Sequence, residues 1–251
     1  MRYLLILLPV ASLIFTLSVT AAEIPELIKK SDALDKLGKN QEALTLCLEA
    51  EKASPNDGEI LRRIAKQYAE LVLEAPDQTR KRALADKSLE FAKRSVAAAP
   101  KNALTHLSLA ICYGRAATVS DAKTKIAYSK LIKQHADDAL ALDPNNDLTH
   151  FVLGSWSYEM ANLNGLLRAM ARVVYGAIPT ATNKDAVRFL EKAVALNPRR
   201  VSNHAALGRA YAALGDVTRA KLNLSRALSL PNGDKADELV KKEARENLAK
   251  L

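Results

Sequence analysis

The sequence contains few cysteines, few aromatic residues and little glycine or proline. Two Cys in 251 residues are too few for a disulfide-stapled scaffold or for a zinc site built on cysteine. Aromatic residues make up 5% of the chain, and nine Gly and nine Pro exclude collagen-like and low-complexity classes. A β-sandwich needs more β-branched and aromatic residues than this chain has. The Ala- and Leu-rich composition therefore favours an all-α protein of closely packed helices.

Long apolar runs are also scarce, and the one that is present lies at the N-terminus. Arg2 supplies a positive charge, residues 3–17 are almost entirely apolar, and small residues at 20–22 suit signal-peptidase cleavage. We expect residues 1–22 to be a cleavable signal peptide and the mature chain to be periplasmic or secreted. The alternative is an uncleaved anchor that holds the protein at a membrane, since residues 3–22 are long enough to span a bilayer.

From residue 23 onward the chain carries a repeated helical pattern. The tetratricopeptide (TPR) pattern W-x2-L-G-x2-Y, A-x3-F and P has a period of about 34 residues. Repeat five shows it most completely, with Leu207, Gly208, Tyr211, Ala220 and Pro231 at the expected spacing. We place five repeats and a C-terminal capping helix in a domain over 23–251, at approximately 24–57, 58–102, 103–146, 147–200, 201–233 and 234–250. Such hairpins stack into a right-handed superhelix, because each leaves one apolar face unburied.

The repeats differ in length, which predicts where helices are extended. The prolines that end repeats one to four are Pro55, Pro100, Pro144 and Pro198, and every interval exceeds 34 residues. In repeats two and three the extra residues predict long B helices over 77–98 and 120–141. In repeat four they predict an extra helix, Leu166–Tyr175, before a B helix that Thr182 caps, with Asp185 three residues later as an imperfect capping box.

Repeat four also resembles a known family. The run His150-Phe-Val-Leu-Gly-Ser-Trp156, the Tyr175-Gly176 pair and the Pro179-Thr-Ala-Thr182 linker are similar to the most characteristic segment of the regulator of microtubule dynamics family. The resemblance covers roughly residues 57–232. It implies a divergent TPR fold and, from the eukaryotic members, an association with microtubules or organelle membranes.

The concave groove of a TPR superhelix is lined by recurring positions of each A helix. The candidate partner-binding residues at these positions are Arg62, Lys66, Leu107, Ile111, Phe151, Tyr158 and Arg209. The centre of this set is apolar and its flanks are basic, which suits an extended or helical peptide with apolar anchors and acidic ends. The alternative is that the inserted helix or the long B helices fold over the groove and bury it.

Histidine and cysteine residues give no metal site in this interpretation. His106, His150 and His204 recur at the fourth position of helix A, one repeat apart, whereas ligands of one ion must converge at about 2 Å. We expect partly buried packing residues there, and His135 to be an isolated surface residue without a partner motif. Cys47 and Cys112 lie two repeats apart and are expected to be free, largely buried thiols.

No catalytic motif accompanies the repeats, so we expect no enzymatic activity and no cofactor. The net charge is +9, but the basic clusters at 80–82 and 199–200 lack interleaved aromatic residues and are interpreted as solvated helix ends rather than a nucleic-acid site. The sequence favours a non-enzymatic TPR scaffold that binds a protein or peptide outside the cytoplasm. The alternatives are a membrane-anchored organiser and, through the family resemblance, a microtubule-associated regulator.

Overall fold

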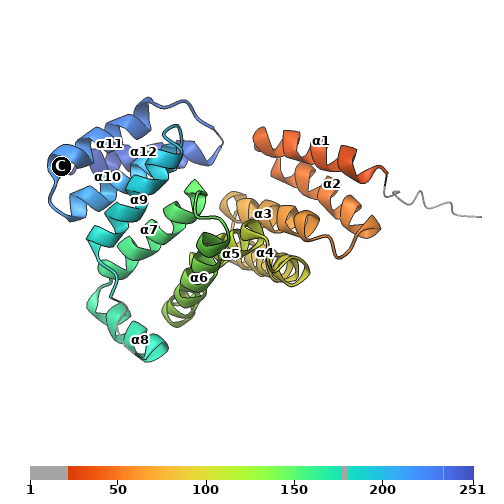
Figure 1. Ribbon diagram of the computed structural model, residues 1–251, viewed down its shortest axis with the longest axis horizontal. Helices are drawn as coiled ribbons and strands as arrows, with labels where there is room; N and C mark the ends of the chain where they lie inside the picture. Colours follow the sequence, from red (N-terminus) through yellow and green to blue (C-terminus); the bar gives the residue numbers. More distant parts are fainter. Residues whose placement is uncertain (1–21, 177–179, 234) are drawn as a thin grey trace, which may run out of the picture.

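The computed structural model describes residues 22–176, 180–233 and 235–251, so the predicted leader, apart from Ala22, lies outside the described residues. Within these ranges the chain forms twelve helices and no strand (Figure 1). Their bounds are α1 Ile24–Lys36, α2 Asn40–Ala53, α3 Gly58–Glu74, α4 Gln78–Ala98, α5 Ala103–Ala117, α6 Ala122–Leu142, α7 Asp147–Ala161, α8 Gly165–Tyr175, α9 Asn183–Leu196, α10 Val201–Ala213, α11 Val217–Ser229 and α12 Ala236–Leu248. The structure is the all-α TPR-like solenoid that the repeat pattern predicts.

Five helix hairpins follow one another along the solenoid: α1–α2, α3–α4, α5–α6, α7–α9 and α10–α11. The B helices α4 and α6 are each 21 residues long, whereas α11 has 13. The long helices begin where Asp77 and Asp121 accept hydrogen bonds from the backbone N–H groups of Arg80 and Thr124. The predicted lengthening of these two B helices is therefore confirmed.

Within the last two hairpins a glycine of the A helix lies against a leucine of the B helix. A Cβ atom added at Gly154 would lie 2.6 Å from Cγ of Leu190, and one at Gly208 would lie 2.6 Å from Cγ of Leu224. Both leucines are fully buried. Because real Cβ atoms do not approach this closely, the absence of a side chain at the two glycines is what lets these helices pack together.

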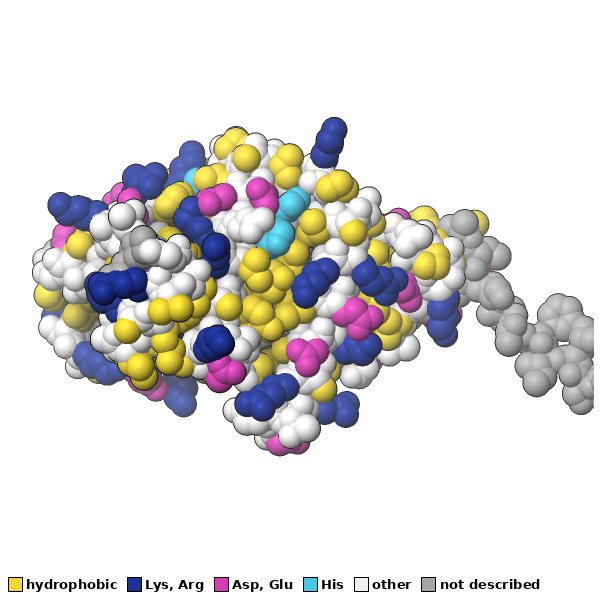
Figure 2. Space-filling model, turned by 90° about the horizontal axis from the view of Figure 1, so that it is seen from below, with side chains coloured by type: hydrophobic (Ala, Val, Ile, Leu, Met, Phe, Trp, Pro, Cys, Tyr) yellow, Lys and Arg dark blue, Asp and Glu magenta, His cyan; other side chains and the backbone are white. Residues whose placement is uncertain are grey.

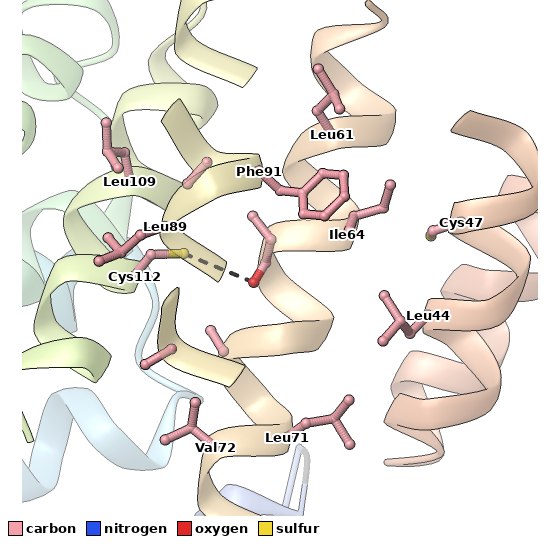
Figure 3. Packing of buried hydrophobic residues seen from close by; sticks show 14 of the residues in the cluster. Leu44, Cys47, Leu61, Ile64, Leu71, Val72, Leu89, Phe91, Leu109 and Cys112 are labelled. Carbon is pink, nitrogen blue, oxygen red and sulfur yellow. Dashed lines mark hydrogen bonds between the residues drawn. The ribbon is translucent and has the colours of Figure 1, made fainter. Parts of the chain in front are cut away.

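The N-terminal half of the core surrounds α3. Leu61 and Ile64 on α3 are buried together with Phe91 on α4 (Figure 3). Cys47 and Cys112 are both free and buried, and Figure 3 shows them on opposite sides of α3. The expectation of two free thiols is confirmed, and burial raises the pKa of Cys112 to about 12, which keeps that thiol protonated.

The C-terminal helix α12 covers the end of the last repeat. Val240 and Ala244 of α12 pack into a cluster with Val201 of α10 and Leu224 of α11. Apolar surface on α10 and α11 is thereby removed from water, as a terminal repeat requires.

The segment before α12 also reaches the N-terminal repeats, where it approaches the turn between α1 and α2 (Figure 1). The Lys235 ammonium lies 3.2 Å from a carboxylate oxygen of Glu74 at the end of α3. A Cβ atom added at Gly38, which has a φ of 69°, would lie 3.3 Å from Cβ of Lys235. The two ends of the solenoid are therefore in direct contact.

Candidate binding cleft

An apolar cleft of about 430 Å³ opens between repeats three and four. Its walls come from α5, α6 and α7, and Leu163 and Leu167 border it at the start of α8. The apolar residues that line it include Ala110, Ile111, Ile126, Ile132, Phe151, Val152, Trp156 and Met160. Seen from below, hydrophobic side chains gather in the middle of the molecule between lysine and arginine side chains (Figure 2).

The walls of this cleft are held in place by hydrogen bonds that converge on Ser129 of α6. The indole Nε1–H of Trp156 on α7 donates to the backbone carbonyl of Ser129 at 2.9 Å. The Tyr175 hydroxyl at the end of α8 donates to Ser129 Oγ at 2.8 Å, because the serine hydroxyl itself donates to the carbonyl of Ile126. One residue therefore fixes two neighbouring helices, α7 and α8, against α6.

Two polar atoms at the cleft are buried without a hydrogen-bond partner among the described residues. They are Ser155 Oγ on α7 and Arg115 Nε on α5. The guanidinium of Arg115 also lies 3.7 Å from a carboxylate oxygen of Glu70. Buried polar atoms normally have partners, so these two atoms beside the cleft are exceptions to the rule.

The structure brings some of the predicted groove residues to this cleft and leaves others elsewhere. Ile111 and Phe151 line the cleft. Leu107 is only 4% exposed and belongs to the core beneath it.

The charged members of the predicted groove are already paired within the chain. The Arg62 guanidinium lies 2.8 Å from a carboxylate oxygen of Glu59, and the Lys66 ammonium lies 2.5 Å from a carboxylate oxygen of Asp35. The remaining cation, Arg209 on α10, lies over the ring of Tyr158 on α7, with 5.2 Å between the guanidinium carbon and the ring centroid. None of these three cations lines the apolar cleft.

The inserted helix α8 borders the cleft without filling it. Its start matches the predicted Leu166–Tyr175 helix to within one residue, because Asn164 caps it by accepting from the N–H of Leu167. Only Ala171 of α8 is fully buried, and Val173 is 85% exposed. Across the described ranges, no helix has both the length and the hydropathy of a membrane span.

The three repeat histidines share one contact that spacing alone makes recognisable. Each ring Nε2 lies 2.9 to 3.0 Å from the carbonyl oxygen of a proline six residues earlier. The pairs are His106 with Pro100, His150 with Pro144, and His204 with Pro198. The expectation of packing residues is confirmed, and the three side chains are more buried than the partial burial expected, with at most 9% exposed. In the sequence, the recurring P-x5-H spacing indicates this contact between histidine and the proline carbonyl.

His135 is not the isolated surface residue that the sequence predicts. It lies on α6 with its Nδ1 atom 3.3 Å from Nδ1 of His106, beside the carboxylate of Asp138. The prediction is wrong because α6 is a long helix, so its register against α5 cannot be taken from the standard repeat. Burial and the neighbouring His106 lower the pKa of His135 and favour its neutral ring.

Comparison with known proteins gives a consistent picture of the fold. The sequence profile described as "Regulator of microtubule dynamics protein 1-3" matches residues 27–251. Mouse regulator of microtubule dynamics protein 1 is 27% identical over 92% of this chain and 75% of its own length. Regulator of microtubule dynamics protein 3 of Xenopus laevis is 29% identical over 86% of this chain, which spans about half (47%) of that relative.

Among solved structures, a TPR protein of Thermus thermophilus is similar in fold. It superposes with a TM-score of 0.65 at 21% identity and covers 90% of this chain and 99% of its own.

Proposed function

Since this chain belongs to the regulator of microtubule dynamics protein 1-3 family and has a TPR-like fold, we propose that it is a non-enzymatic scaffold that binds a polypeptide partner in the cleft between α5, α6, α7 and α8. The observation that carries the proposal is an open apolar cleft whose lining also includes two polar side chains, Ser155 and Arg115. Binding sites commonly combine apolar walls with a few convergent polar groups of this kind.

The chemistry of the cleft defines the segment that fits it. Apolar side chains of a partner gain burial against Ile111, Phe151 and Trp156. Arg115 lines the cleft and its guanidinium can only donate hydrogen bonds, so an acceptor such as a backbone carbonyl beside the partner's apolar residues suits it. Lys125 and Glu159 both line the cleft and carry opposite charges, so the cleft can face a partner residue of either sign next to the apolar anchor.

The proposal is tested by filling the cleft without disturbing the fold. Gly114 lines the cleft, and a Cβ atom added there meets only Ile132 Cδ1, at 4.0 Å. Gly114→Leu therefore occupies the cleft while it improves the helix propensity of α5 by up to about 1 kcal/mol. Gly165→Leu is the matched control, because a Cβ atom there has no neighbour within 4 Å and Gly165 does not line the cleft.

A photo-reactive phenylalanine analogue at position 111 reports which polypeptides enter the cleft. We expect a discrete set of crosslinked partners in the otherwise wild-type protein and in the Gly165→Leu background. The same set should be lost in the Gly114→Leu background, with circular dichroism confirming that the helices remain. An unchanged set of crosslinked partners in folded Gly114→Leu protein would contradict the proposal.

Export from the cytoplasm is a second part of the proposal, and it rests on the apolar N-terminal run that follows Arg2. The intact mass of the protein from fractionated cells tests it. A mass that lacks residues 1–22 in a soluble extracytoplasmic fraction supports export. A full-length mass in the membrane fraction supports instead the membrane-anchored organiser.

The family name supplies a further candidate partner, the microtubule. Membership over residues 27–251 favours it, and co-sedimentation with polymerised tubulin tests it. Loss of co-sedimentation in Gly114→Leu but not in Gly165→Leu would assign microtubule binding to the cleft. Equal co-sedimentation of both variants would place it on another surface, and no co-sedimentation would exclude it.

A further inference from the structure

A cluster of two histidines and one aspartate bridges the helices of repeat three, away from the cleft lining. His106 comes from α5, whereas His135 and Asp138 lie three residues apart on α6. The two Nδ1 atoms are 3.3 Å apart, and Asp138 Oδ2 lies 3.4 Å from His106 Nδ1 and 3.7 Å from His135 Nδ1. Three potential metal-ligand atoms thus lie within 4.8 Å of one another.

The proton on His106 can be placed from its contacts. Its Nε2 lies 2.9 Å from the carbonyl oxygen of Pro100, which can only accept a hydrogen bond, so Nε2 carries the proton. Nδ1 of the neutral ring then presents its lone pair toward His135 and Asp138. A backbone carbonyl that fixes the tautomer and orientation of a ligating histidine is the usual outer-shell partner in metal sites.

The spacing of the three atoms fits a tetrahedral ion. Zinc binds histidine nitrogen and carboxylate oxygen at about 2.0–2.2 Å, so two ligands of a tetrahedral site lie roughly 3.3–3.5 Å apart. The observed separations of 3.3, 3.4 and 3.7 Å are close to this range. The side chain of Asp138 is 45% exposed, which gives an ion a path from solvent and leaves room for a water as fourth ligand.

The other two repeat histidines, His150 and His204, lack the neighbours that His106 has at its second ring nitrogen. His150 makes the same contact with a proline carbonyl through Nε2. Its Nδ1 atom has no hydrogen-bond partner among the described residues, and Phe189 lies beside its ring. His204 faces the side-chain oxygen of Asn223. Only repeat three, within the described chain, brings a second histidine and a carboxylate to the free nitrogen.

We propose that His106, His135 and Asp138 form a binding site for a divalent transition-metal ion of the zinc type, which links α5 to α6 in repeat three. Imidazole nitrogen with one carboxylate suits Zn²⁺ and its neighbours in the first transition row rather than Mg²⁺ or Ca²⁺. Because the ligands come from both helices, a bound ion stabilises the folded hairpin, and the stabilisation grows with ion concentration. Without the ion, a hydrogen bond between the two rings occupies the same atoms.

The site is tested by titrating the full chain with Zn²⁺. The protein must carry no polyhistidine tag, because such a tag would itself bind the ion. We expect about one ion per chain by isothermal titration calorimetry, and a rise in the thermal midpoint of roughly 5 °C in excess Zn²⁺. His135→Gln and Asp138→Asn should each weaken binding at least tenfold and remove the thermal shift. Mg²⁺ at the same concentration should have no effect.

Asp137→Asn is the matched control, because Asp137 lies next to Asp138 on α6 but pairs with Lys133 instead. It should bind Zn²⁺ like the wild type. Asp138→Asn changes an exposed side chain, so it remains informative if His135→Gln fails to fold. The proposal is overturned if wild-type protein binds no Zn²⁺, or if Asp138→Asn and Asp137→Asn bind it equally well. It is also overturned if His150→Gln, and not His135→Gln, loses the ion.

Discussion

Repeats four and five build the same hairpin from very different connections. Residues 162–182 separate α7 from α9, and this segment includes α8, whereas only residues 214–216 separate α10 from α11. Yet a Cβ atom added to the A-helix glycine would lie 2.6 Å from the facing leucine Cγ in both repeats. The contact between helices, and not the length of the connection, determines how closely a pair packs, because a longer surface loop costs little free energy.

What the longer connection changes is the surroundings of the hairpin. In repeat four it places α8 against α6, through the bond between Tyr175 and Ser129, and so completes the border of the apolar cleft. In repeat five the short turn leaves no room for such an addition. The insertion therefore completes one border of the candidate site without altering the packing of the hairpin that carries it.

The largest expected effect comes from removing the leucine of each pair. Leu190→Ala and Leu224→Ala each empty a fully buried site and should lower the free energy of unfolding by about 3 kcal/mol. If the hairpins are equivalent, the two losses agree within about 1 kcal/mol in urea denaturation followed by circular dichroism. A much smaller loss for Leu190→Ala would show that the insertion relaxes repeat four.

Filling the glycine positions probes the same contact from the other helix. Gly154→Ala and Gly208→Ala place a methyl group against leucine and should each cost about 1–3 kcal/mol by overpacking. Gly165→Ala is the control, since a Cβ atom there has no neighbour within 4 Å, and it should be neutral or slightly stabilising. Wild-type stability in Gly154→Ala would mean that α7 and α9 have room for a methyl group between them.

A substitution at the contact between α8 and α6 tests whether the α7–α9 hairpin is independent of the insertion. Tyr175→Phe removes the hydroxyl that donates to Ser129 and should lower the local opening free energy of α8 by about 1 kcal/mol. Hydrogen–deuterium exchange should show faster exchange in α8 and an unchanged rate in α9. Faster exchange in both helices would show that the hairpin depends on the insertion after all.

The smallest expected effect concerns the start of α9, which follows the insertion and has its own capping box. The pKa of Asp185 is held below its usual value by hydrogen bonds from Thr182. The hydroxyl of Thr182 has the larger effect and its backbone N–H the smaller one. A lowered folded-state pKa gives stability that is present above the unfolded pKa of about 3.9 and is lost as pH falls through the folded value. Since Asp185 is largely solvated, Asp185→Asn should cost less than about 0.5 kcal/mol at pH 7.

At pH 2 the difference between wild type and Asp185→Asn in urea denaturation should vanish. Thr182→Ala serves as the comparison, because loss of its hydroxyl as an N-cap acceptor costs about 1 kcal/mol at pH 7, and all of this cost except the part from its bond to Asp185 should remain at pH 2. A difference for Asp185→Asn that persists at pH 2 would mean that the charge of the carboxylate is not its source.

Much of the fold is predictable from sequence because local chemistry marks the helix ends. The long helix predicted over 77–98 begins one residue later in the structure, at the cap that Asp77 provides. The capping box at Thr182, expected to be imperfect because aspartate replaces glutamate, is complete. These features depend on residues three or four apart, which a single sequence displays directly.

The candidate sites are harder to predict because they depend on the relative placement of separate helices. Of the residues predicted from the repeat positions, Ile111 and Phe151 line the cleft, whereas Leu107 lies in the core, and the partner-binding role of all three stays a prediction. They also do not reveal the partner of His106, since the standard repeat gives no register for His135 on a lengthened helix. Distances between helices of unequal length follow from packing and not from spacing along the chain.

The contact between Lys235 and the turn at Gly38 has a consequence for how this molecule deforms. An open-ended solenoid behaves as a spring that lengthens or coils with little resistance at its tips. Here the tips touch, so stretching the spring first requires the segment before α12 to leave the N-terminal turn. Adding or deleting a repeat would likewise displace one tip from the other. The number of repeats is thus tied to the closure of the molecule as a whole.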